Sequence, residues 1–593
     1  MPRPVAHAHL GEMITETVAA HPSRPALRER VDDAWKVITY RELQERVDAV
    51  ATALIERGVR HGDRVAIFSR NRPAWTVVDL AAIGIGAVVV PIYQTSTPKQ
   101  ARHILADSAT SVVFAEGADE ADRIAQVRHE LPDLVDVITF DPVDGHTGYT
   151  DLIATTPDAD TLTTRRAQVS GDDVASIIYT SGTTGDPKGV VLSHGAFTSE
   201  IAAVLSFFDI TEHDHSLCFL PLAHALERAW TFVVLTVGAM NTYWSDARTV
   251  ADAMPLARPT LMVSVPRLYE KVYSVAHEQA TASPLKNRIF TWAVATGRRA
   301  QAAGRRRGPW LNAQLRLADR LVLRNIREAI GGPKTVLASG GAPLRQEVEE
   351  FFHAAGILVC QGYGLTEAAP LISFNSPDAF RFGTVGRVMP GSEFRIGDEG
   401  EILYRGPNVM LGYHNLPDAT AESMTEDGWL RTGDIGEIDA DGFLTITDRM
   451  KDIIVTAGGK NVAPGPIEGE LASDPLIEYA VVLGDNRPCL TVLVRPNLPG
   501  LEGFAKQAAI AFDDAHELLS HERITEEIRA RIAKVSEGLA NHEKIREFEV
   551  IEDDMTMENG MLTPTLKVRR RAVEQKFRDK VESMYERIRT RRK

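Results

Sequence analysis

The sequence predicts an α/β protein built on parallel, doubly wound sheets, and two features support this prediction. Between residues 37 and 115, strand-like runs such as Val65-Ala-Ile-Phe68 and Val88-Val-Val90 alternate with helix-like runs. Strand, helix and strand at this spacing imply right-handed crossovers, which place the strands parallel in one sheet. Further along the chain, apolar runs end repeatedly in glycine-rich turns, as expected of loops that gather at one edge of such a sheet.

The first helix and the strands around it can be placed from their residues. The segment Thr39-Tyr40-Arg41-Glu42-Leu43 opens an amphipathic run whose apolar residues are Val47, Val50, Ala51 and Leu54. Gly62-Asp63 then leads into the strand at 65–68, and Pro91 ends the strand that starts at Val88. Two more strands are predicted at residues 112–114 and 137–140.

Length and composition indicate a multidomain globular protein. The chain has 593 residues, of which 44% are hydrophobic and 25% charged, so several large cores can be filled. A net charge of −15 argues against a general nucleic-acid binder. Three widely spaced cysteines without a Cys-x-x-Cys pair indicate neither a disulfide framework nor a zinc site, which fits a reducing cytosol.

Targeting and membrane-spanning segments are not predicted. The first ten residues lack the apolar core of a signal peptide. The longest uncharged apolar stretch, residues 80–93, has 14 residues, whereas about 20 are needed to cross a bilayer. We therefore expect a soluble, cytoplasmic protein.

The stretch from Tyr179 to His194 predicts a phosphate-binding loop. It follows the apolar run Val174-Ala-Ser-Ile-Ile178 and holds Lys188, several hydroxyl residues and three glycines, at 182, 185 and 189. Glycines let backbone N–H groups turn toward one concavity, hydroxyls add short donors, and the lysine supplies a positive charge. The Walker spacing is not met, since no Gly-Lys-Ser/Thr follows Gly182. A flexible linker is the alternative, but a linker needs no buried strand before it.

Two later turns predict an adenine site and a metal ligand. Thr335-Val-Leu-Ala-Ser-Gly-Gly-Ala-Pro343 and Ile357-Leu-Val-Cys-Gln-Gly-Tyr-Gly-Leu-Thr-Glu367 both run from a strand into glycines. Gly340 and Gly341 allow close approach of a flat base, and Tyr363 offers a ring for stacking. Glu367 is an oxygen ligand suited to Mg²⁺, with nucleotide phosphates and water as the remaining ligands.

His224 is the candidate for the reacting centre. It lies in Phe219-Leu-Pro-Leu-Ala-His-Ala-Leu-Glu-Arg228, where an apolar strand would deliver it to the sheet edge. The alternative is a structural core histidine. The nearby His213-Asp-His215 and Cys218 lack a second ligand pair at a recognised spacing, so a metal site is not favoured there.

Residues 286–327 carry eleven Lys or Arg against one acid, Asp319. Such a run is usually a solvated helical face. Here Ile289-Phe290, Trp292, Trp310-Leu311 and Leu321-Val-Leu323 lie between the charges, so a patch that contacts an anionic membrane surface is the alternative.

These blocks resemble the adenylate-forming superfamily, which includes acyl-CoA synthetases, luciferases and peptide-synthetase adenylation domains. The loop at Tyr179, the His224 block, Pro259–Lys271, the two glycine turns, Asp427–Gly436, Asp448–Asp452 and Leu562–Val568 stand in the order expected of that superfamily. The block Pro259–Lys271 is most similar to its bacterial long-chain fatty-acid–CoA ligases. The resemblance implies a large N-terminal domain of doubly wound sheets with a small β-barrel-like part (1–448), a hinge (449–451) and a small mobile α+β C-terminal domain (452–593).

The resemblance also implies a role for individual residues. His224 would lie beside the substrate carboxylate and Lys567 would be the catalytic lysine, with Lys451 in the hinge. Coenzyme A would pass Gly458 and Gly459, and Trp230 is a candidate gate of an acyl tunnel. Glu367 and Thr183 would bind Mg²⁺. ATP and AMP would contact Thr180, Ser181, Gly182, Thr183, Thr184, Gly185, Lys188, Gly340, Gly341, Ala342, Gly362, Tyr363, Gly364, Thr366, Asp434 and Arg449.

The activity implied is ATP-dependent, AMP-forming ligation of a long-chain fatty acid to coenzyme A through an acyl-adenylate. One alternative is a fatty-acyl-AMP ligase that loads a carrier protein, but such enzymes usually carry an insert after the Thr-Glu motif, and only 15 residues separate Glu367 from Gly383. The other is a nucleotide-binding regulator without chemistry, which the presence of both Glu367 and Lys567 disfavours.

Overall fold

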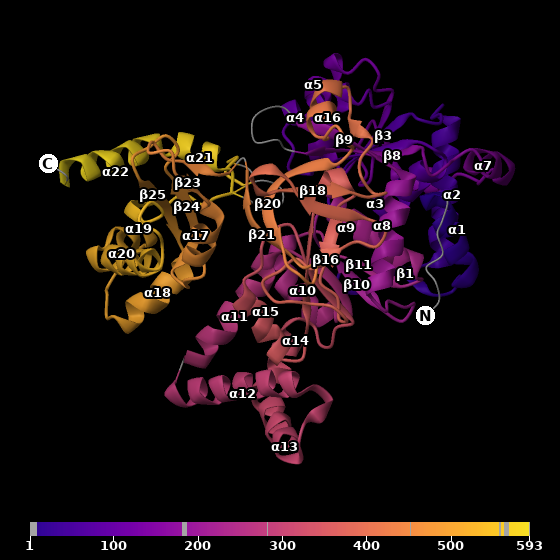
Figure 1. The fold of residues 1–593 in the computed structure, drawn as a ribbon. Coiled ribbons are helices and arrows are strands. Elements are labelled where there is room, and N and C mark those ends of the chain that lie inside the picture. The colour runs from indigo at the N-terminus through magenta and orange to yellow at the C-terminus, as the bar shows by residue number, and fades with distance from the viewer. Residues whose placement is uncertain are drawn as a thin grey trace. The chain divides into compact units, whose positions relative to one another are not determined.

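The computed structural model describes residues 9–180, 187–281, 283–450, 452–556, 559–562 and 568–591. The chain divides into two compact units (Figure 1). The first comprises Met1–Arg395, Leu403–Thr432 and Ile438–Thr445, and the second comprises Ile396–Ile402, Gly433–Glu437 and Ile446–Lys593. The predicted boundary at 449–451 stays a prediction.

An eight-stranded sheet of the first unit contains the predicted parallel strands. Its order is β19-β9-β8-β4-β3-β5-β6-β7, and the strands from β8 to β7 pair in parallel. The strands are β3 (Arg64–Phe68), β4 (Val88–Ile92), β5 (Val112–Ala115), β6 (Asp136–Thr139), β7 (Thr147–Gly148), β8 (Val174–Thr180), β9 (Lys188–Ser193) and β19 (Gly412–Tyr413). The helix α2 (Tyr40–Glu56) precedes β3, and the helices between the later strands are α3 (Pro73–Gly84), α4 (Pro98–Asp107), α5 (Ala118–Val127), α6 (Tyr149–Ile153) and α7 (Ala159–Arg166).

The start of α2 shows how the sequence sets an element boundary. Thr39 is the N-cap, its hydroxyl accepts from the Glu42 N–H at 3.3 Å, and the Glu42 carboxylate accepts from the Thr39 N–H at 2.7 Å. This reciprocal capping satisfies two backbone donors that the helix itself leaves without partners. The helix therefore begins where the sequence predicted it.

A nine-stranded sheet forms the other half of this unit. Its order is β16-β15-β14-β13-β12-β10-β11-β1-β2, with parallel pairing from β1 to β14 and antiparallel strands at both edges. The strands are β1 (Pro25–Val31), β2 (Ala34–Thr39), β10 (His215–Cys218), β11 (Met240–Tyr243), β12 (Leu261–Ser264), β13 (Val336–Ser339), β14 (Val359–Gly364), β15 (Leu371–Phe374) and β16 (Arg387–Val388). This confirms the predicted α/β class with doubly wound sheets.

The other helices of the first unit include those that pack on the nine-stranded sheet. One core contains Met262 of β12, Tyr269 of α11 and Phe351 of α15. The helices are α1 (Leu10–Ala20), α8 (His194–Phe207), α9 (Ala225–Thr236), α10 (Val250–Ala257), α11 (Pro266–Thr281), α12 (Pro284–Ala303), α13 (Pro309–Ala318), α14 (Arg324–Ala329), α15 (Gln346–Ala354) and α16 (Pro417–Glu422).

The small β part and the C-terminal residues complete the chain. A four-stranded sheet has the order β17-β18-β20-β21, from β17 (Glu393–Ile396), β18 (Glu401–Arg405), β20 (Leu430–Ile438) and β21 (Leu444–Arg449). The C-terminal part has the hairpin β22 (Ile454–Val455) and β23 (Asn461–Val462), and a sheet of β24 (Ile477–Leu483), β25 (Leu490–Pro496) and β26 (Ile545–Val550). Its helices are α17 (Pro464–Leu471), α18 (Leu498–Gln507), α19 (Ala515–Ser520), α20 (Glu522–Glu537), α21 (Arg570–Lys576) and α22 (Arg578–Arg591).

Across the described ranges, none of the helices combines the length and apolar character needed to cross a membrane.

Candidate functional site

The predicted phosphate loop connects two paired strands of the eight-stranded sheet. Strands β8 and β9 are antiparallel, with Thr180 opposite Lys188. The loop residues predicted to contact phosphate, Ser181, Gly182, Thr183, Thr184 and Gly185, lie outside the described residues. The structure therefore places Thr180 at one end of the loop and Pro187 and Lys188 at the other.

Lys188 and Glu367 contact the ring and the hydroxyl of the same tyrosine, Tyr413. The Lys188 ammonium lies 5.0 Å from the centre of the Tyr413 ring, a distance at which the ring attracts a cation. The Tyr413 hydroxyl donates to Glu367 Oε1 at 2.7 Å. Strand β19 holds Tyr413 in place through its pairing with β9. The end of the phosphate loop and the predicted metal ligand thus share one neighbour.

Tyr413 was missed by sequence reasoning. Burial, and then the charge of Glu367, raise the pKa of its phenol, so it stays a hydrogen-bond donor at neutral pH. Its only sequence signal is a Gly-Tyr pair 46 residues after Glu367, and nothing in that spacing points to the contact.

Glu367 offers a hard carboxylate oxygen of the kind that Mg²⁺ prefers. Its backbone carbonyl accepts from the Met410 N–H at 2.8 Å, which fixes the short turn that carries it. Within the described ranges, no group of three or more His, Cys, Asp or Glu side chains is placed to hold a metal. Glu367 therefore fits a role as one oxygen ligand of a Mg²⁺ ion whose other ligands would be phosphate and water.

The two predicted adenine turns lie beside each other because β13 and β14 are parallel neighbours. A Cβ at Gly340 would lie 3.6 Å from Leu226 Cδ2 and 3.7 Å from the Gly362 carbonyl oxygen. At Gly364 a Cβ would come within 1.8 Å of the Pro370 carbonyl oxygen, which no side chain can do. The structure therefore brings Gly340, Gly362 and the start of α9 to the same edge of the sheet.

The remaining residues of these turns differ in exposure. Gly341 has a φ of +81°, which favours glycine, and it is exposed together with Ala342. Tyr363 is 7% exposed and Thr366 is 9% exposed. Most of the Tyr363 ring is thus covered by the protein itself.

His224 is the N-cap of α9, and its Nδ1 accepts from the Leu226 N–H at 3.1 Å. Two buried side chains hold the loop that leads to it. Asn71 donates to the Leu220 carbonyl at 2.6 Å and accepts from the Leu222 N–H at 2.9 Å, while Glu227 Oε2 accepts from the Leu220 N–H at 3.2 Å. The position of His224 therefore depends on the side chains of Asn71 and Glu227.

Sequence reasoning missed Asn71, which is 149 residues from its partner Leu220. Glu227 was inside the quoted block but was given no role. Burial raises the pKa of Glu227 to about 8, so the carboxyl is mostly protonated at neutral pH.

Helix α9 is anchored to both sheets. Arg228 is fully buried, forms an ion pair with Asp79 of α3 and donates to Ser176 of β8 at 2.6 Å. Trp230 is 5% exposed and donates from its indole to Ser216 of β10 at 3.0 Å. The two sheets are thereby fixed relative to the helix that begins at His224.

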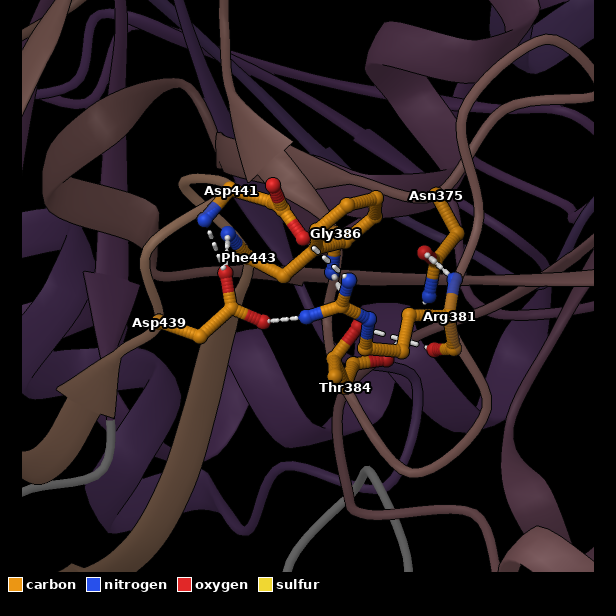
Figure 2. A network of polar contacts seen from close by, with 7 residues as sticks. All are labelled: Asn375, Arg381, Thr384, Gly386, Asp439, Asp441 and Phe443. Carbon is orange, nitrogen blue, oxygen red and sulfur yellow. Dashed lines mark hydrogen bonds and ion pairs between the residues drawn. The ribbon is translucent and has the colours of Figure 1, made fainter.

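The segment that follows Glu367 is held in place by a network of polar contacts around Arg381 (Figure 2). Arg381 pairs with Asp439 and, at 2.6 Å, with Asp441, and its guanidinium lies 4.6 Å from the centre of the Phe443 ring. Its backbone N–H donates to Asn375 Oδ1 at 3.0 Å, and its carbonyl accepts from the Thr384 hydroxyl at 2.8 Å. This short connection is therefore a fixed turn, held at both ends.

The second unit contains the two residues predicted at the ribose. Arg449 Nε donates to Asp434 Oδ1 at 2.7 Å, and Asp434 is 3% exposed. The predicted coenzyme A residues, Gly458 and Gly459, are exposed in the turn between β22 and β23. Lys451 and Lys567 lie outside the described residues.

The strand order, the glycine turns at one sheet edge and the Lys188–Tyr413–Glu367 arrangement are typical of an α/β protein whose ligand site lies at the carboxyl ends of its strands. The family described as "AMP-binding enzyme" matches residues 14–414, and the one described as "AMP-binding enzyme C-terminal domain" matches residues 451–589. The chain belongs to the AMP-binding enzyme family.

Named relatives cover nearly the whole chain. It is 38% identical over 586 residues to the long-chain-fatty-acid–CoA ligase FadD15 of Mycobacterium bovis, with 98% of this chain and 97% of that protein covered. It is 31% identical to the long-chain-fatty-acid–CoA ligase 5 of Rattus norvegicus, covering 98% of this chain and 89% of that one.

Solved structures share the fold. The adenylation domain of a carboxylic acid reductase from Segniliparus rugosus, in complex with AMP and a co-purified carboxylic acid, has a TM-score of 0.77 at 21% identity, with 98% and 94% of the two chains covered. The anthranilate CoA ligase AuaEII, in complex with anthranoyl-AMP, has a TM-score of 0.72 at 20% identity, with 96% and 97% covered.

Proposed function

We propose that this protein is an AMP-forming ligase that joins a long-chain fatty acid to coenzyme A. The observation that carries the proposal is the likeness to long-chain-fatty-acid–CoA ligases, which extends over 98% of this chain and 97% of the relative. ATP, a fatty acid and coenzyme A are the substrates.

The chemistry needs two displacements. A carboxylate oxygen attacks the α-phosphorus of ATP and pyrophosphate leaves, which gives an acyl-adenylate. The sulfur of coenzyme A then attacks the acyl carbon and AMP leaves with the bonding electrons, while the thiol proton is lost to solvent. Catalysis of the first step depends on positioning and on stabilising charge at phosphate.

We assign roles within the first unit on this basis. Lys188 and the loop from Thr180 hold the phosphates, and Gly340, Gly341, Ala342, Gly362, Tyr363, Gly364 and Thr366 form the adenine side. His224 orients the substrate carboxylate from the end of α9, and Trp230 borders the acyl chain. Mg²⁺, when bound with the nucleotide, neutralises phosphate charge, and Glu367 with Thr183 would be its protein ligands.

Roles in the second unit follow the same proposal. Asp434 and Arg449 bind the ribose hydroxyls. Gly458 and Gly459 border the passage for coenzyme A, Lys451 is in the hinge, and Lys567 stabilises charge at the α-phosphate. A cytoplasmic location and contact of residues 286–327 with a membrane surface also belong to this proposal.

The alternative of a fatty-acyl-AMP ligase is not favoured. The named full-length relatives are CoA ligases. The segment where such enzymes usually carry an insert is the fixed turn around Arg381. With coenzyme A supplied, we expect acyl-CoA and AMP in equal amounts, whereas acyl-AMP that persists would indicate the alternative.

An acyl-length series tests the substrate class. AMP formation should be faster per unit enzyme with palmitate than with acetate or benzoate, because a long chain adds apolar contact that stabilises the bound complex. Faster turnover of acetate or benzoate would overturn the long-chain assignment.

Glu367→Gln tests the metal assignment. The change keeps the shape of the side chain and its hydrogen bond to Tyr413 but removes one negative charge from the proposed cation site. We expect adenylation to slow by roughly 100-fold, with an unchanged unfolding midpoint and a higher Mg²⁺ requirement. Tyr413→Phe is the converse control, since it removes the hydrogen bond between Tyr413 and Glu367 and keeps the charge of Glu367. An unchanged rate in Glu367→Gln would remove this residue from the metal site.

A further inference from the structure

Two side chains of helix α4 contact the two ends of the predicted phosphate loop. The Nε2 of His103 lies 2.9 Å from the Pro187 carbonyl oxygen, and because a carbonyl oxygen can only accept, Nε2 carries the proton. Four residues later, Asp107 Oδ2 accepts from the Tyr179 hydroxyl at 2.6 Å. Tyr179 stands at the start of the loop and Pro187 at its end. Residues four apart lie on the same face of a helix, so one face of α4 holds both ends of the loop.

Helix α4 is itself fixed at its start and along its inner face. At its N-cap, Thr97 donates from its backbone N–H to Gln100 Oε1 at 2.8 Å, and its hydroxyl accepts from the Gln100 N–H at 3.3 Å. Three apolar residues of the helix are buried in the core cluster that also contains Tyr179, namely Ala101, Ile104 and Leu105. The two contacts with the loop therefore start from a helix that is capped and packed.

The two contacts also lie beside each other. The rings of His103 and Tyr179 pack edge to face, with their centroids 6.1 Å apart. Tyr179 is 4% exposed, and burial followed by its hydrogen bond to Asp107 raises the pKa of the phenol, so it stays a donor at neutral pH. His103, Tyr179 and Asp107 thus form one packed group that joins the helix to the loop.

The last residue of α4 also contacts the segment that carries Tyr413. The Asp107 carbonyl oxygen accepts from His414 Nε2 at 3.2 Å. His414 directly follows Tyr413, whose ring lies beside Lys188 and whose hydroxyl donates to Glu367. The same end of α4 therefore connects the phosphate loop with the turn that carries the proposed metal ligand.

We propose that His103 and Asp107 are positioning residues for the phosphate loop. Acting through Pro187 and Tyr179, they fix the separation of the two ends of the loop, and so the direction in which the loop presents its donors to ATP. Neither side chain touches the nucleotide in this proposal, which rests on the proposed role of the loop in holding the phosphates. AMP lacks the two outer phosphates, so misplaced loop ends should weaken the binding of ATP much more than that of AMP. A purely structural role would affect both nucleotides alike.

Calorimetric titration of the full-length protein with ATP and with AMP, without fatty acid, tests the proposal. His103→Leu removes the donor to Pro187, and Tyr179→Phe removes the hydroxyl that Asp107 accepts. We expect each variant to bind ATP roughly tenfold more weakly, with AMP affinity and the unfolding midpoint unchanged. His103→Gln offers an amide donor in place of the ring N–H and should restore most of the ATP affinity.

A double-mutant cycle tests the hydrogen bond between Tyr179 and Asp107. If this bond is the route, Tyr179→Phe/Asp107→Ala should bind ATP no more weakly than Asp107→Ala alone, because the first change has already removed the contact. Additive losses would overturn that route. The matched control is Arg102→Leu on the same helix, which removes an exposed ion pair with Glu130 at 3.0 Å. The control should bind both nucleotides like the unmodified protein.

Kinetics supply a second measurement. In His103→Leu and Tyr179→Phe, the KM for ATP should rise while thioester formation from supplied acyl-AMP stays unchanged, because that step does not use the outer phosphates. Equal weakening of ATP and AMP binding, or unchanged ATP binding in both variants, would overturn the proposal. An unmodified protein that binds ATP but forms no AMP would contradict the proposed ligation alone, because nucleotide binding is measured separately.

Discussion

At the scale of single residues, Glu227 shows how burial changes the chemistry of a side chain. In the sequence it is one acid in His-Ala-Leu-Glu-Arg, next to an arginine. In the structure its Oε2 accepts from the Leu220 N–H at 3.2 Å, and burial raises its pKa to about 8. The group that positions the loop before His224 is therefore a neutral acid at physiological pH.

Glu227→Gln should consequently be well tolerated. The amide keeps the acceptor for Leu220 and resembles the protonated acid in shape and charge, so we expect kcat for acyl-AMP formation to change less than threefold. Glu227→Ala removes the acceptor and should lower kcat by roughly 10- to 100-fold, the scale for misplacing a reacting group. Pyrophosphate release measures both. Equal losses in the two variants would mean that a carboxylate charge is required.

Because His194 is buried in its neutral form, we expect the folded protein to lose stability in acid. It is fully buried, its Nδ1 accepts from the Leu10 N–H at 3.3 Å, and burial followed by repulsion from His9 lowers its pKa to about 3. The unfolded chain takes up this proton near pH 6.5, and the folded chain only near pH 3. Between these values the unfolded state binds more protons, so the free energy of unfolding falls as the pH is lowered.

His194→Gln isolates this contribution. The amide keeps an acceptor for Leu10 but does not titrate, so the free energy of unfolding should depend less steeply on pH between about 5 and 6. The slope should decrease by up to about 1.4 kcal/mol per pH unit. Urea unfolding at several pH values measures it, with His213→Gln, an exposed histidine, as the control. An unchanged slope would mean that His194 is protonated in the folded protein.

At the scale of elements, α9 links the two sheets through buried polar groups. Arg228 reaches Asp79 on α3 and Ser176 on β8, while Trp230 reaches Ser216 on β10. The same helix places His224 at its first turn. Stability and site geometry are therefore coupled through one element.

Arg228→Met should destabilise the protein by about 3–5 kcal/mol, because it leaves the Asp79 carboxylate buried without a partner. Arg228→Met/Asp79→Leu replaces the whole pair by apolar side chains and should recover most of that loss. Guanidinium unfolding midpoints measure both variants. If the double variant were less stable than the single one, the ion pair would not be the origin of the effect.

At the scale of the whole molecule, the two half-reactions should depend on different residues of the C-terminal unit. Lys567→Ala should lower acyl-AMP formation roughly 100-fold or more, the scale for removing a charge partner of the transition state. It should spare thioester formation from supplied acyl-AMP. Single-turnover assays of each half-reaction measure this.

Gly458→Leu should do the reverse. A Cβ at Gly458 would meet only Thr456 Oγ1, at 4.0 Å, so a side chain fits there without disturbing its own unit. We expect acyl-AMP to accumulate because coenzyme A fails to discharge it. Gly459 is less suitable for this test, since its φ of +70° strains any other residue. Equal loss of both half-reactions in Lys567→Ala and Gly458→Leu would contradict the separate roles proposed for these two residues and the hinge at Lys451.

Local patterns in the sequence determined much of this protein. The alternation of strand and helix predicted the parallel strands β3, β4 and β5, and the amphipathic run that opens at Thr39 predicted the start of α2, because periodicity acts between neighbours in the chain. The order of the glycine-rich blocks predicted the family for the same reason, since each block is one continuous loop.

Only the tertiary structure decided what these blocks contact. Tyr413 reaches Glu367 across 46 residues, and Asn71 reaches Leu220 across 149, because the packing of the two sheets and not sequence spacing brings them together. Burial, which depends on the packed core, set the pKa of Glu227 and of His194. The packing of the helices also leaves Trp310, Leu317 and Leu321 exposed. The sequence pattern alone does not tell these exposed apolar residues from apolar residues in a core.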